Sequence, residues 1–376
     1  MQRPRQLTAE DFSAFDPADR GAKITGLMLF RKTPYVYSPE ARGAKVLALY
    51  SGYFIGEIRI KPYLNALLGR GVIADYQIAD RALKTEGLHG PYEFTHIWCQ
   101  RNVSTAQFAF LKAHSHVPVI YDMDDLLTSI PDFVASSKRA MRKRVAWCLS
   151  RAKAVTVASE PLKRSLGEDA PAAANKIVVL KNGCAQSAPP EPRSAQKRLV
   201  WTSSDVPFFL REDPSFATGL AALLNKHAYE AILIGRFEES LCRLFDKSRH
   251  IGHLDFASFR DYLRTLAGSL AIAPMPTRLP TSAQRYFDAK SDIKLIDYLA
   301  CGLVPIVSNA ASYTRSELFM PEFSAATADE MLKRIEACIA DPDDALRKID
   351  ATIHQAGLLR KREFSELSKP LDSLFA

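Results

Sequence analysis

The residues with the clearest chemical potential form a short cluster in the second half of the chain. Four polar residues fall within eight positions, at the expected start of a helix over 292–301: Lys290, Ser291, Lys294 and Asp297. The first turn of a helix presents backbone N–H groups that attract anions, and the two ammonium groups add positive charge. The cluster therefore predicts a diphosphate site, in which the Asp297 carboxylate accepts hydrogen bonds from sugar hydroxyls. The alternative is a solvated helix start with ordinary surface lysines.

The local pattern sets the limits of this helix. Its apolar residues recur with a helical period, so we expect one face to be buried and Lys294 to lie on the surface. Ser291 or Asp292 can cap the helix start. Gly302 stands where the helix is expected to stop, because glycine adopts the left-handed conformation that ends many helices.

Strand-like and helix-like segments alternate along the chain in two series. The strands are expected at 44–50, 96–100, 117–121, 154–158 and 176–180, and then at 198–202, 231–235, 270–273 and 303–307. This alternation predicts an α/β fold with two doubly wound, Rossmann-like domains that face each other across a cleft. The predicted parts are an extension over 1–43, a first domain over 44–185, a linker over 186–197, a second domain over 198–345, and C-terminal helices over 346–376 that can pack back on the first domain.

Ligands of such sheets bind beyond the carboxyl ends of the strands, so residues that follow a strand are candidates. Asp122, Asp124 and Asp125 follow the strand at 117–121. Three carboxylates this close must be solvated, paired with cations or partly protonated. Asp124 and Asp122 are the candidate catalytic residues, because a carboxylate here can bind an acceptor hydroxyl or take its proton. A metal-binding Asp-x-Asp and a helix N-cap at 124 or 125 are the alternatives. Other candidates in the first domain are Ser51, Gly52 and Tyr53 after the strand at 44–50, Arg59 on the helix expected over 58–68, and Arg101 after the strand at 96–100.

The segment 290–308 resembles the donor-binding segment of GT-B glycosyltransferases related to the retaining family-four enzymes (glycosyl transferases group 1). The sequence DYLACGLVP from Asp297 to Pro305 is similar to the family pattern Glu-Ala-x-Ala-x-Gly-x-Pro-Val. Two positions depart from it: Ala289 stands where a sugar-side glutamate is usual, and Pro305 is displaced by one residue. The YDMDD run ending at Asp125 and the KSDIK run starting at Lys290 are similar to the bacterial surface-polysaccharide branch.

The resemblance implies a GT-B fold whose second domain binds the nucleotide-sugar donor. It implies that Asp297 replaces a ribose-side glutamate and that Asp124 takes the place of an acceptor-side histidine. The end of the first domain also looks like that of the family, and Asn182-Gly183 is expected to form a turn with positive φ. The implied donor-binding residues are Arg236, Lys290, Ser291, Asp292, Lys294 and Asp297, and the acceptor-side residues are Ser51, Gly52, Tyr53, Arg59, Arg101 and Asp125.

A basic helix is predicted around residues 138–153, where apolar residues again recur with a helical period. Trp147 is expected to lie off the apolar face and among cations, which suits an anionic membrane surface or a lipid-linked diphosphate acceptor. The alternatives are nucleic acid, for which no recognised motif accompanies the charge, and a solvated helix whose tryptophan packs on a neighbour. The residues of this patch are Arg139, Lys143, Arg144, Trp147 and Arg151.

Composition limits the class of protein. With 376 residues, 47% of them hydrophobic, the chain can bury two cores, which excludes a disordered tail or a disulfide-stapled miniprotein. Six scattered cysteines without a Cys-x-x-Cys pair favour a reducing, cytoplasmic setting and no zinc site. No apolar run is long enough to span a bilayer. The net charge is +9 over 1–190 and −1 over the remainder, so a large anionic partner is expected to meet the first half.

The sequence thus predicts a glycosyltransferase that moves a hexose or deoxyhexose from a nucleotide diphosphate to a hydroxyl of a glycan or lipid-linked glycan in bacterial envelope synthesis. We expect it to need no metal and no cofactor, to bind no nucleic acid, and to act in the cytoplasm or on the inner face of the cell membrane. The alternatives are a sugar-nucleotide epimerase or hydrolase, and a catalytically silent GT-B scaffold or binding module.

Overall fold

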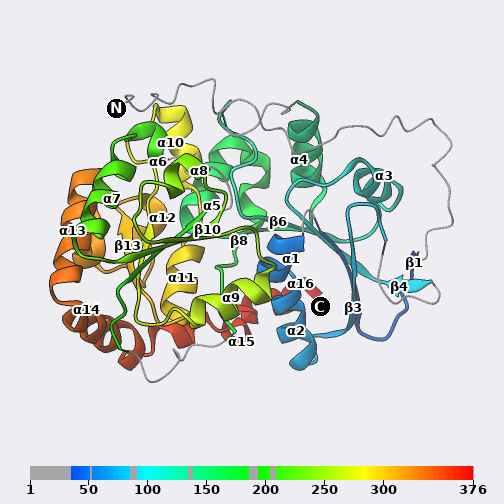
Figure 1. The fold of residues 1–376 in the computed structure, drawn as a ribbon. Coiled ribbons are helices and arrows are strands. Elements are labelled where there is room, and N and C mark those ends of the chain that lie inside the picture. Colours follow the sequence, from blue (N-terminus) through cyan, green and yellow to red (C-terminus); the bar gives the residue numbers. More distant parts are fainter. Residues whose placement is uncertain are drawn as a thin grey trace.

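The computed structural model describes residues 35–50, 53–84, 91–133, 139–185, 194–203 and 209–375. Two six-stranded sheets dominate it, and every strand pair in them is parallel. Helices lie on both faces of each sheet, and the two sheets form separate halves of the molecule (Figure 1). This is the arrangement that alternating strands and helices produce, because parallel neighbours need a crossover connection.

The first domain holds the sheet with strand order β3-β2-β5-β6-β7-β8. Its central strand β6 (Val119–Met123) is buried along its whole length, as expected for a parallel strand covered on both faces. The other strands are β2 (Ala44–Leu49), β3 (Ile73–Ala79), β5 (His96–Gln100), β7 (Ala154–Val157) and β8 (Ile177–Val179), and β1 (Tyr35–Tyr37) pairs with β4 (Tyr92–Phe94) beside them. The helices are α1 (Tyr53–Arg59), α2 (Lys61–Gly69), α3 (Thr105–Ala113), α4 (Arg139–Arg151) and α5 (Glu160–Asp169).

The second domain holds the sheet with strand order β11-β10-β9-β12-β13-β14. Its strands are β9 (Arg198–Ser203), β10 (Glu230–Gly235), β11 (Ser248–Ile251), β12 (Leu270–Ala273), β13 (Val304–Ser308) and β14 (Ser324–Ala325). Its helices are α6 (Phe209–Glu212), α7 (Phe216–Lys226), α8 (Glu239–Cys242), α9 (Phe256–Arg264), α10 (Thr281–Asp288), α11 (Ile293–Ala300), α12 (Ala311–Thr314), α13 (Ala328–Ala340) and α14 (Pro342–Ile349).

All nine strands expected from the sequence are present, although β6 begins two residues later than predicted. The sequence patterns miss β1, β3, β4, β11 and β14 because these strands are short or partly exposed and lack a continuous apolar run. The single helix expected over 58–68 is two helices, α1 and α2. Pro62 lies in the first turn of α2, where its missing N–H is tolerated, whereas a continuous helix would need that donor.

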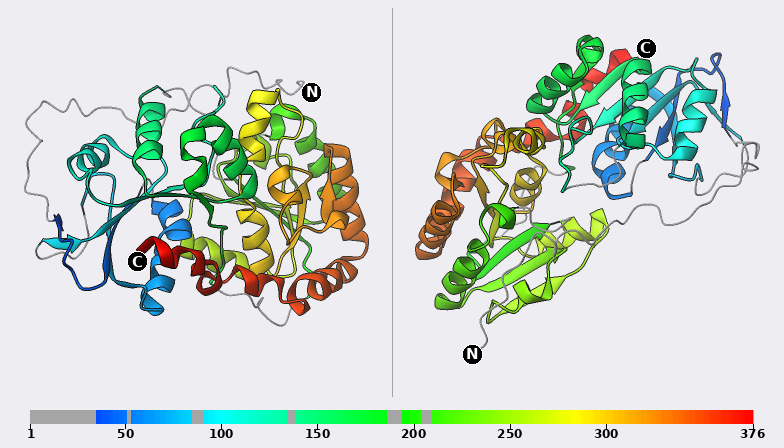
Figure 2. Two further views of the ribbon diagram at one scale, coloured as in Figure 1. Left: turned by 180° about the vertical axis from the view of Figure 1, so that it is seen from behind. Right: turned by 90° about the horizontal axis from the view of Figure 1, so that it is seen from above.

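The C-terminal segment returns to the first domain. After α14 the chain runs through a π-helical turn (Asp350–Gln355) and a 3-10 helix (Leu358–Arg362) to α15 (Phe364–Leu367) and α16 (Asp372–Phe375). The ring of Phe364 lies 5.0 Å from that of Tyr63 in α2, and the ring of Phe375 lies 6.0 Å from that of Trp98 in β5. Figure 2 shows this last segment, in red, beside the blue helices of the first domain.

Gly183 serves close packing and does not form the expected turn. Its φ is not positive, so that prediction is wrong. A Cβ atom at this position would lie 2.8 Å from the carbonyl oxygen of Arg362 and 2.8 Å from the ring of Phe364. Next to it, the Cys184 N–H donates to the same Arg362 carbonyl over 2.8 Å. Glycine is needed here because the returning C-terminal segment passes directly over the backbone.

Replacement of Gly183 by alanine should therefore lower the melting temperature, with a cost of about 1–3 kcal/mol for overpacking. The matched control is Gly69→Ala in α2, where an added Cβ meets nothing within 4 Å and alanine is the better helix former. We expect that control to melt at or above the wild-type temperature in a thermal unfolding experiment. Equal melting temperatures for the two variants would contradict this account of the C-terminal contact.

Candidate functional site

The residues after β6 meet the residues before α11 across the domain boundary. The Lys290 ammonium lies 2.9 Å from Oδ1 of Asp125, while the Arg101 guanidinium binds Oδ2 of the same carboxylate. Nε of Arg101 also lies 3.2 Å from Oδ1 of Asp124. The Lys290 ammonium sits 4.8 Å from the ring centre of Tyr286 in α10. Two cations and two carboxylates therefore balance one another where predicted donor and acceptor residues come together.

Arg101 adopts a backbone conformation that is uncommon for a residue with a side chain. Its φ is +56°, and such left-handed conformations cost free energy unless the surroundings enforce them. Here the Arg101 N–H donates to the Asp122 carbonyl over 2.7 Å, and the Tyr121 hydroxyl donates to the Arg101 carbonyl over 2.8 Å. These bonds hold the turn after β5 so that the guanidinium reaches the carboxylates after β6.

Two cationic residues stand at the carboxyl ends of the adjacent strands β9 and β10. Nζ of Lys294 donates to the Thr202 carbonyl over 2.7 Å, and the backbone N–H of Arg236 donates to the Ser203 carbonyl over 2.9 Å. Gly235 permits this approach: its φ is +107°, and a Cβ atom there would lie 1.9 Å from the Ser203 carbonyl oxygen. The end of the second sheet thus holds the Lys294 ammonium beside the backbone of Arg236.

Lys294 is half-buried, so the expected surface position is wrong. Burial and, to a smaller extent, repulsion by Lys290 together lower the pKa of its ammonium group to about 8. The group is nevertheless mostly protonated at neutral pH. It also differs from Lys290 in having a carbonyl partner and no carboxylate partner within the described residues.

Ser291 and Asp292 are both bound by other segments. The Asn182 side-chain amide donates to Oγ of Ser291 over 2.7 Å. The expected cap on α11 is absent, because the Asp292 carboxylate makes no bond to the helix N–H groups. It accepts hydrogen bonds from Arg362 and from Ser316, each over 2.6 Å. Asp292 thus anchors the C-terminal segment from a buried position, and its carboxylate is not placed to bind a nucleotide sugar.

Asp297 lies in a buried ion pair that the sequence patterns did not reveal. Arg260 of α9 donates to Oδ1 of Asp297 from Nη2 over 2.7 Å and from Nε over 3.0 Å. Asp297 is 5% exposed. Burial raises the pKa of this carboxyl, and the bonds and charge of Arg260 offset only part of that rise. Arg260 was missed because only the fold brings α9 beside α11.

The structure removes Asp122 and Arg59 from the list of groups that can touch a substrate. Asp122 is 0% exposed and Arg59 is 1% exposed, and Nη2 of Arg59 lies 2.6 Å from Oδ1 of Asp122. Thr156 of β7 donates to the same oxygen over 2.7 Å. The helix N-cap interpretation of Asp124 and Asp125 is also wrong, because bends and turns follow β6. Of the three aspartates, Asp124 is the most exposed.

Three acceptor-side candidates lie wholly or partly outside the described residues. Ser51 and Gly52 lie outside the described residues, and Tyr53 begins α1 but its side chain is not described. They stay predictions on the strength of their place after β2.

The basic helix α4 packs more closely than its sequence suggests. Trp147 is half-buried, with its ring edge-on to Phe108 of α3 at 5.3 Å, so the alternative in which it packs on a neighbour is the one observed. Arg144 donates to the Thr105 hydroxyl over 3.1 Å, and Arg151 donates to the Ser115 carbonyl over 2.7 Å. Lys143 is exposed, and the side chain of Arg139 lies outside the described residues.

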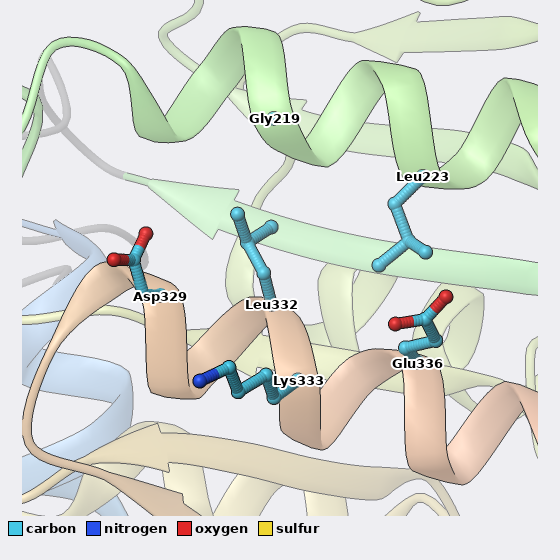
Figure 3. Close-up of a pocket in the computed structure, with 6 residues that line it drawn as sticks. All are labelled: Gly219, Leu223, Asp329, Leu332, Lys333 and Glu336. Carbon is cyan, nitrogen blue, oxygen red and sulfur yellow. The ribbon is translucent and has the colours of Figure 1, made fainter.

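Among the residues that the structure describes, no three His, Cys, Asp or Glu residues are placed to hold a metal ion, and no helix is long and apolar enough to cross a bilayer. A groove of about 320 Å³ lies between α7 and α13 (Figure 3). Its lining residues are Gly219, Leu223, Asp329, Leu332, Lys333 and Glu336, and none of the predicted site residues is among them.

Replacing Asp122 by alanine should cost about 3–5 kcal/mol of stability, because it leaves the Arg59 charge buried and uncompensated. Asp124→Ala is the comparison, since its Arg101 partner is partly exposed and retains Asp125; we expect a cost below about 1 kcal/mol. Denaturant unfolding of both variants provides the measurement. A similar loss of stability in the two variants would show that Asp122 does not have the buried structural role described here.

The comparisons with known proteins agree with this architecture. No family model matches the sequence, and no curated protein matches it. The structure of Anabaena HepE in complex with UDP-glucose matches with a TM-score of 0.58 and 16% identity over 88% of this chain and 98% of that one. T4 phage β-glucosyltransferase with UDP-glucose matches with a TM-score of 0.51 and 9% identity over 88% and 99%.

A further match is a mutant of Staphylococcus aureus TarM in complex with fondaparinux, α-GlcNAc-glycerol and UDP, with a TM-score of 0.52 and 10% identity over 74% of this chain. This chain spans 55% of that protein's length. At such low identities the likeness concerns the fold. Together with the two parallel sheets described above, it shows that the chain has the GT-B fold, with two Rossmann-like domains.

Proposed function

We propose that this protein is a glycosyltransferase that uses a nucleotide-diphosphate sugar as its donor. The observation that carries the proposal is the pair of cationic residues at the ends of adjacent strands: the Lys294 ammonium donates to the Thr202 carbonyl, and the backbone N–H of Arg236 donates to the Ser203 carbonyl. In open α/β sheets this edge is where ligands bind. The fold adds support, because the solved HepE and T4 phage β-glucosyltransferase structures that it resembles contain UDP-glucose.

The chemistry that these residues supply is electrostatic. Breaking the bond between sugar and diphosphate leaves negative charge on the departing oxygen, and fixed cations nearby stabilise the transition state. The carbonyl bond of Lys294 and the backbone bond of Arg236 hold both residues at the strand ends before any ligand arrives. We propose that they, with Lys290, meet this charge and make a metal ion unnecessary.

The acceptor side belongs to the first domain in this proposal. Asp124 is half-buried beside Arg101, at the end of β6 and next to the interdomain pair of Asp125 and Lys290. Its carboxylate would bind the acceptor hydroxyl and receive its proton. By resemblance to the family-four enzymes we propose retention of the anomeric configuration, and a glycan or lipid-linked glycan of the bacterial envelope as acceptor. The exposed basic residues of α4 are the surface that would face an anionic membrane.

The experiment that tests the function is a titration of the full chain with UDP-, GDP- and dTDP-sugars, followed by turnover assays with and without added membrane glycolipid. We expect binding of one donor class, and transfer of sugar only when glycolipid is present. Consumption of donor without transfer would instead show an epimerase or hydrolase. Absence of binding to all three classes would show a GT-B scaffold without donor chemistry.

Lys294 gives the donor site a pH dependence. Because its pKa is about 8 in the free protein, the ammonium group loses its proton as the pH rises above that value. Calorimetry with the tightest binder among UDP, GDP and dTDP should therefore show a fall in affinity between pH 7 and pH 9.5. In Lys294→Arg the guanidinium keeps its charge over this range, so we expect the affinity to change little with pH.

The neutral variant Lys294→Met should weaken binding by about tenfold or more at pH 7, the usual worth of a charge-assisted hydrogen bond. Lys226→Met, which removes an exposed ion pair with Glu336 on the far helices α7 and α13, is the control and should bind normally. If the wild type and Lys294→Arg lost affinity in parallel as the pH rises, Lys294 would not contact the diphosphate.

A further inference from the structure

Two buried arginines converge on Asn182, the residue that links the first domain to the start of α11. Nη1 of Arg59 donates to Oδ1 of Asn182 over 3.0 Å. Nη1 of Arg362 donates to the Asn182 backbone carbonyl over 3.0 Å. Asn182 itself is 2% exposed, and its Nδ2 donates to Oγ of Ser291 over 2.7 Å. The sequence marked Asn182 only as part of a turn.

The arginine fixes which way the Asn182 amide points. A guanidinium group only donates hydrogen bonds, so the amide atom that faces Arg59 must be the oxygen. The NH₂ group then faces Ser291 and donates to its hydroxyl oxygen. Arg59 cannot turn away, because Asp122 holds it with two hydrogen bonds inside the first domain. The amide orientation therefore follows from the hydrogen-bond network.

This orientation decides what the Ser291 hydroxyl can do. A serine hydroxyl has one hydrogen to donate. Since its oxygen already accepts from Asn182, the hydrogen is left for a different acceptor. Ser291 lies two residues before α11, between Lys290 and Lys294, so a ligand atom that accepts this hydrogen bond would be anionic.

We propose that Asn182 is a positioning residue of the donor site. Through the relay Asp122–Arg59–Asn182–Ser291, the first domain turns the Ser291 hydroxyl into a hydrogen-bond donor to the nucleoside diphosphate. This inference rests on the proposed function, and it deepens that function by assigning a first-domain residue to the binding of the donor. The bonds from Arg362 to the Asn182 carbonyl and to Asp292 hold the two backbones together, which leaves the side-chain amide for Ser291.

The test is Asn182→Asp, which reverses the polarity at Ser291. The new carboxylate still accepts from Arg59, but Arg59 is already paired with Asp122 and Arg362 with Asp292 and Glu317, so we also expect the melting temperature to fall. Its second oxygen, however, now takes the only hydroxyl hydrogen of Ser291. We expect the affinity for the tightest binder among UDP, GDP and dTDP to fall about tenfold by calorimetry, as for one lost hydrogen bond to a charged ligand. Ser291→Ala should lose about as much, and the double variant should lose no more than either single variant.

Ser291→Thr keeps the hydroxyl that Ser291→Ala removes, so its affinity for the same nucleotide should be within about twofold of the wild-type affinity. A purely structural role for Asn182 would give a different result: the loss of affinity on Asn182→Asp would be the same with or without the Ser291 hydroxyl. That additive result would overturn the relay. So would normal binding by Ser291→Ala, a variant that does not depend on how Asn182→Asp folds.

Failure of the proposed function looks different. If the wild-type protein bound none of the three nucleotides, there would be no donor site to position, and both the function and the relay would fall. If the wild type binds and Lys294→Met weakens binding while the Asn182 and Ser291 variants do not, the donor site stands and only the relay is wrong.

Discussion

The part of the first domain that carries the candidate site depends on one buried ion pair, between Arg59 at the end of α1 and Asp122 near the end of β6. Charges removed from water are costly unless every hydrogen-bonding group is satisfied, so this pair constrains everything that touches it. Arg59 also donates to the carbonyl of Leu180 and to the side chain of Asn182. The Thr156 hydroxyl donates a further hydrogen bond to the Asp122 carboxylate. The pair thus fixes α1, β6, β7 and the end of the first domain with respect to one another.

A second buried arginine does the same for the other half of the molecule. Arg362 comes from the returning C-terminal segment and binds Asp292 and Glu317 of the second domain. Burial alone would raise the pKa of Glu317, but the hydrogen bonds and charge of Arg362 lower it to about 2. Because Arg362 also holds the Asn182 carbonyl, both arginine networks end at the same residue between the domains. The start of α11 is therefore held from both domains.

The sequence predicted the elements of the fold better than the roles of its charged residues. Continuous apolar runs are local, which explains why all nine expected strands were found. Burial of a polar residue is not local. Asp122 and Asp124 are two positions apart and chemically identical, yet one is enclosed by Arg59 from α1 and the other faces the interdomain cluster. Asp292 and Asp297 were likewise paired with arginines, Arg362 and Arg260, that lie far away in the sequence.

In the proposed function the interdomain charge cluster has to open before a diphosphate can reach Lys290, and the sharing of Asp125 lowers the free-energy cost of that opening. Asp125 is shared between Lys290 and Arg101, so when Lys290 turns to a ligand, the carboxylate keeps the Arg101 guanidinium and no buried charge is left unpaired. The Lys290 side chain is 28% exposed, so its ammonium group is already partly hydrated and can move without a large change in solvation free energy. Had Asp125 paired with Lys290 alone, release would have left a buried carboxylate without a partner. The strained backbone of Arg101 therefore has a function in this proposal: it keeps a guanidinium on Asp125 while Lys290 turns to the anion on the donor side.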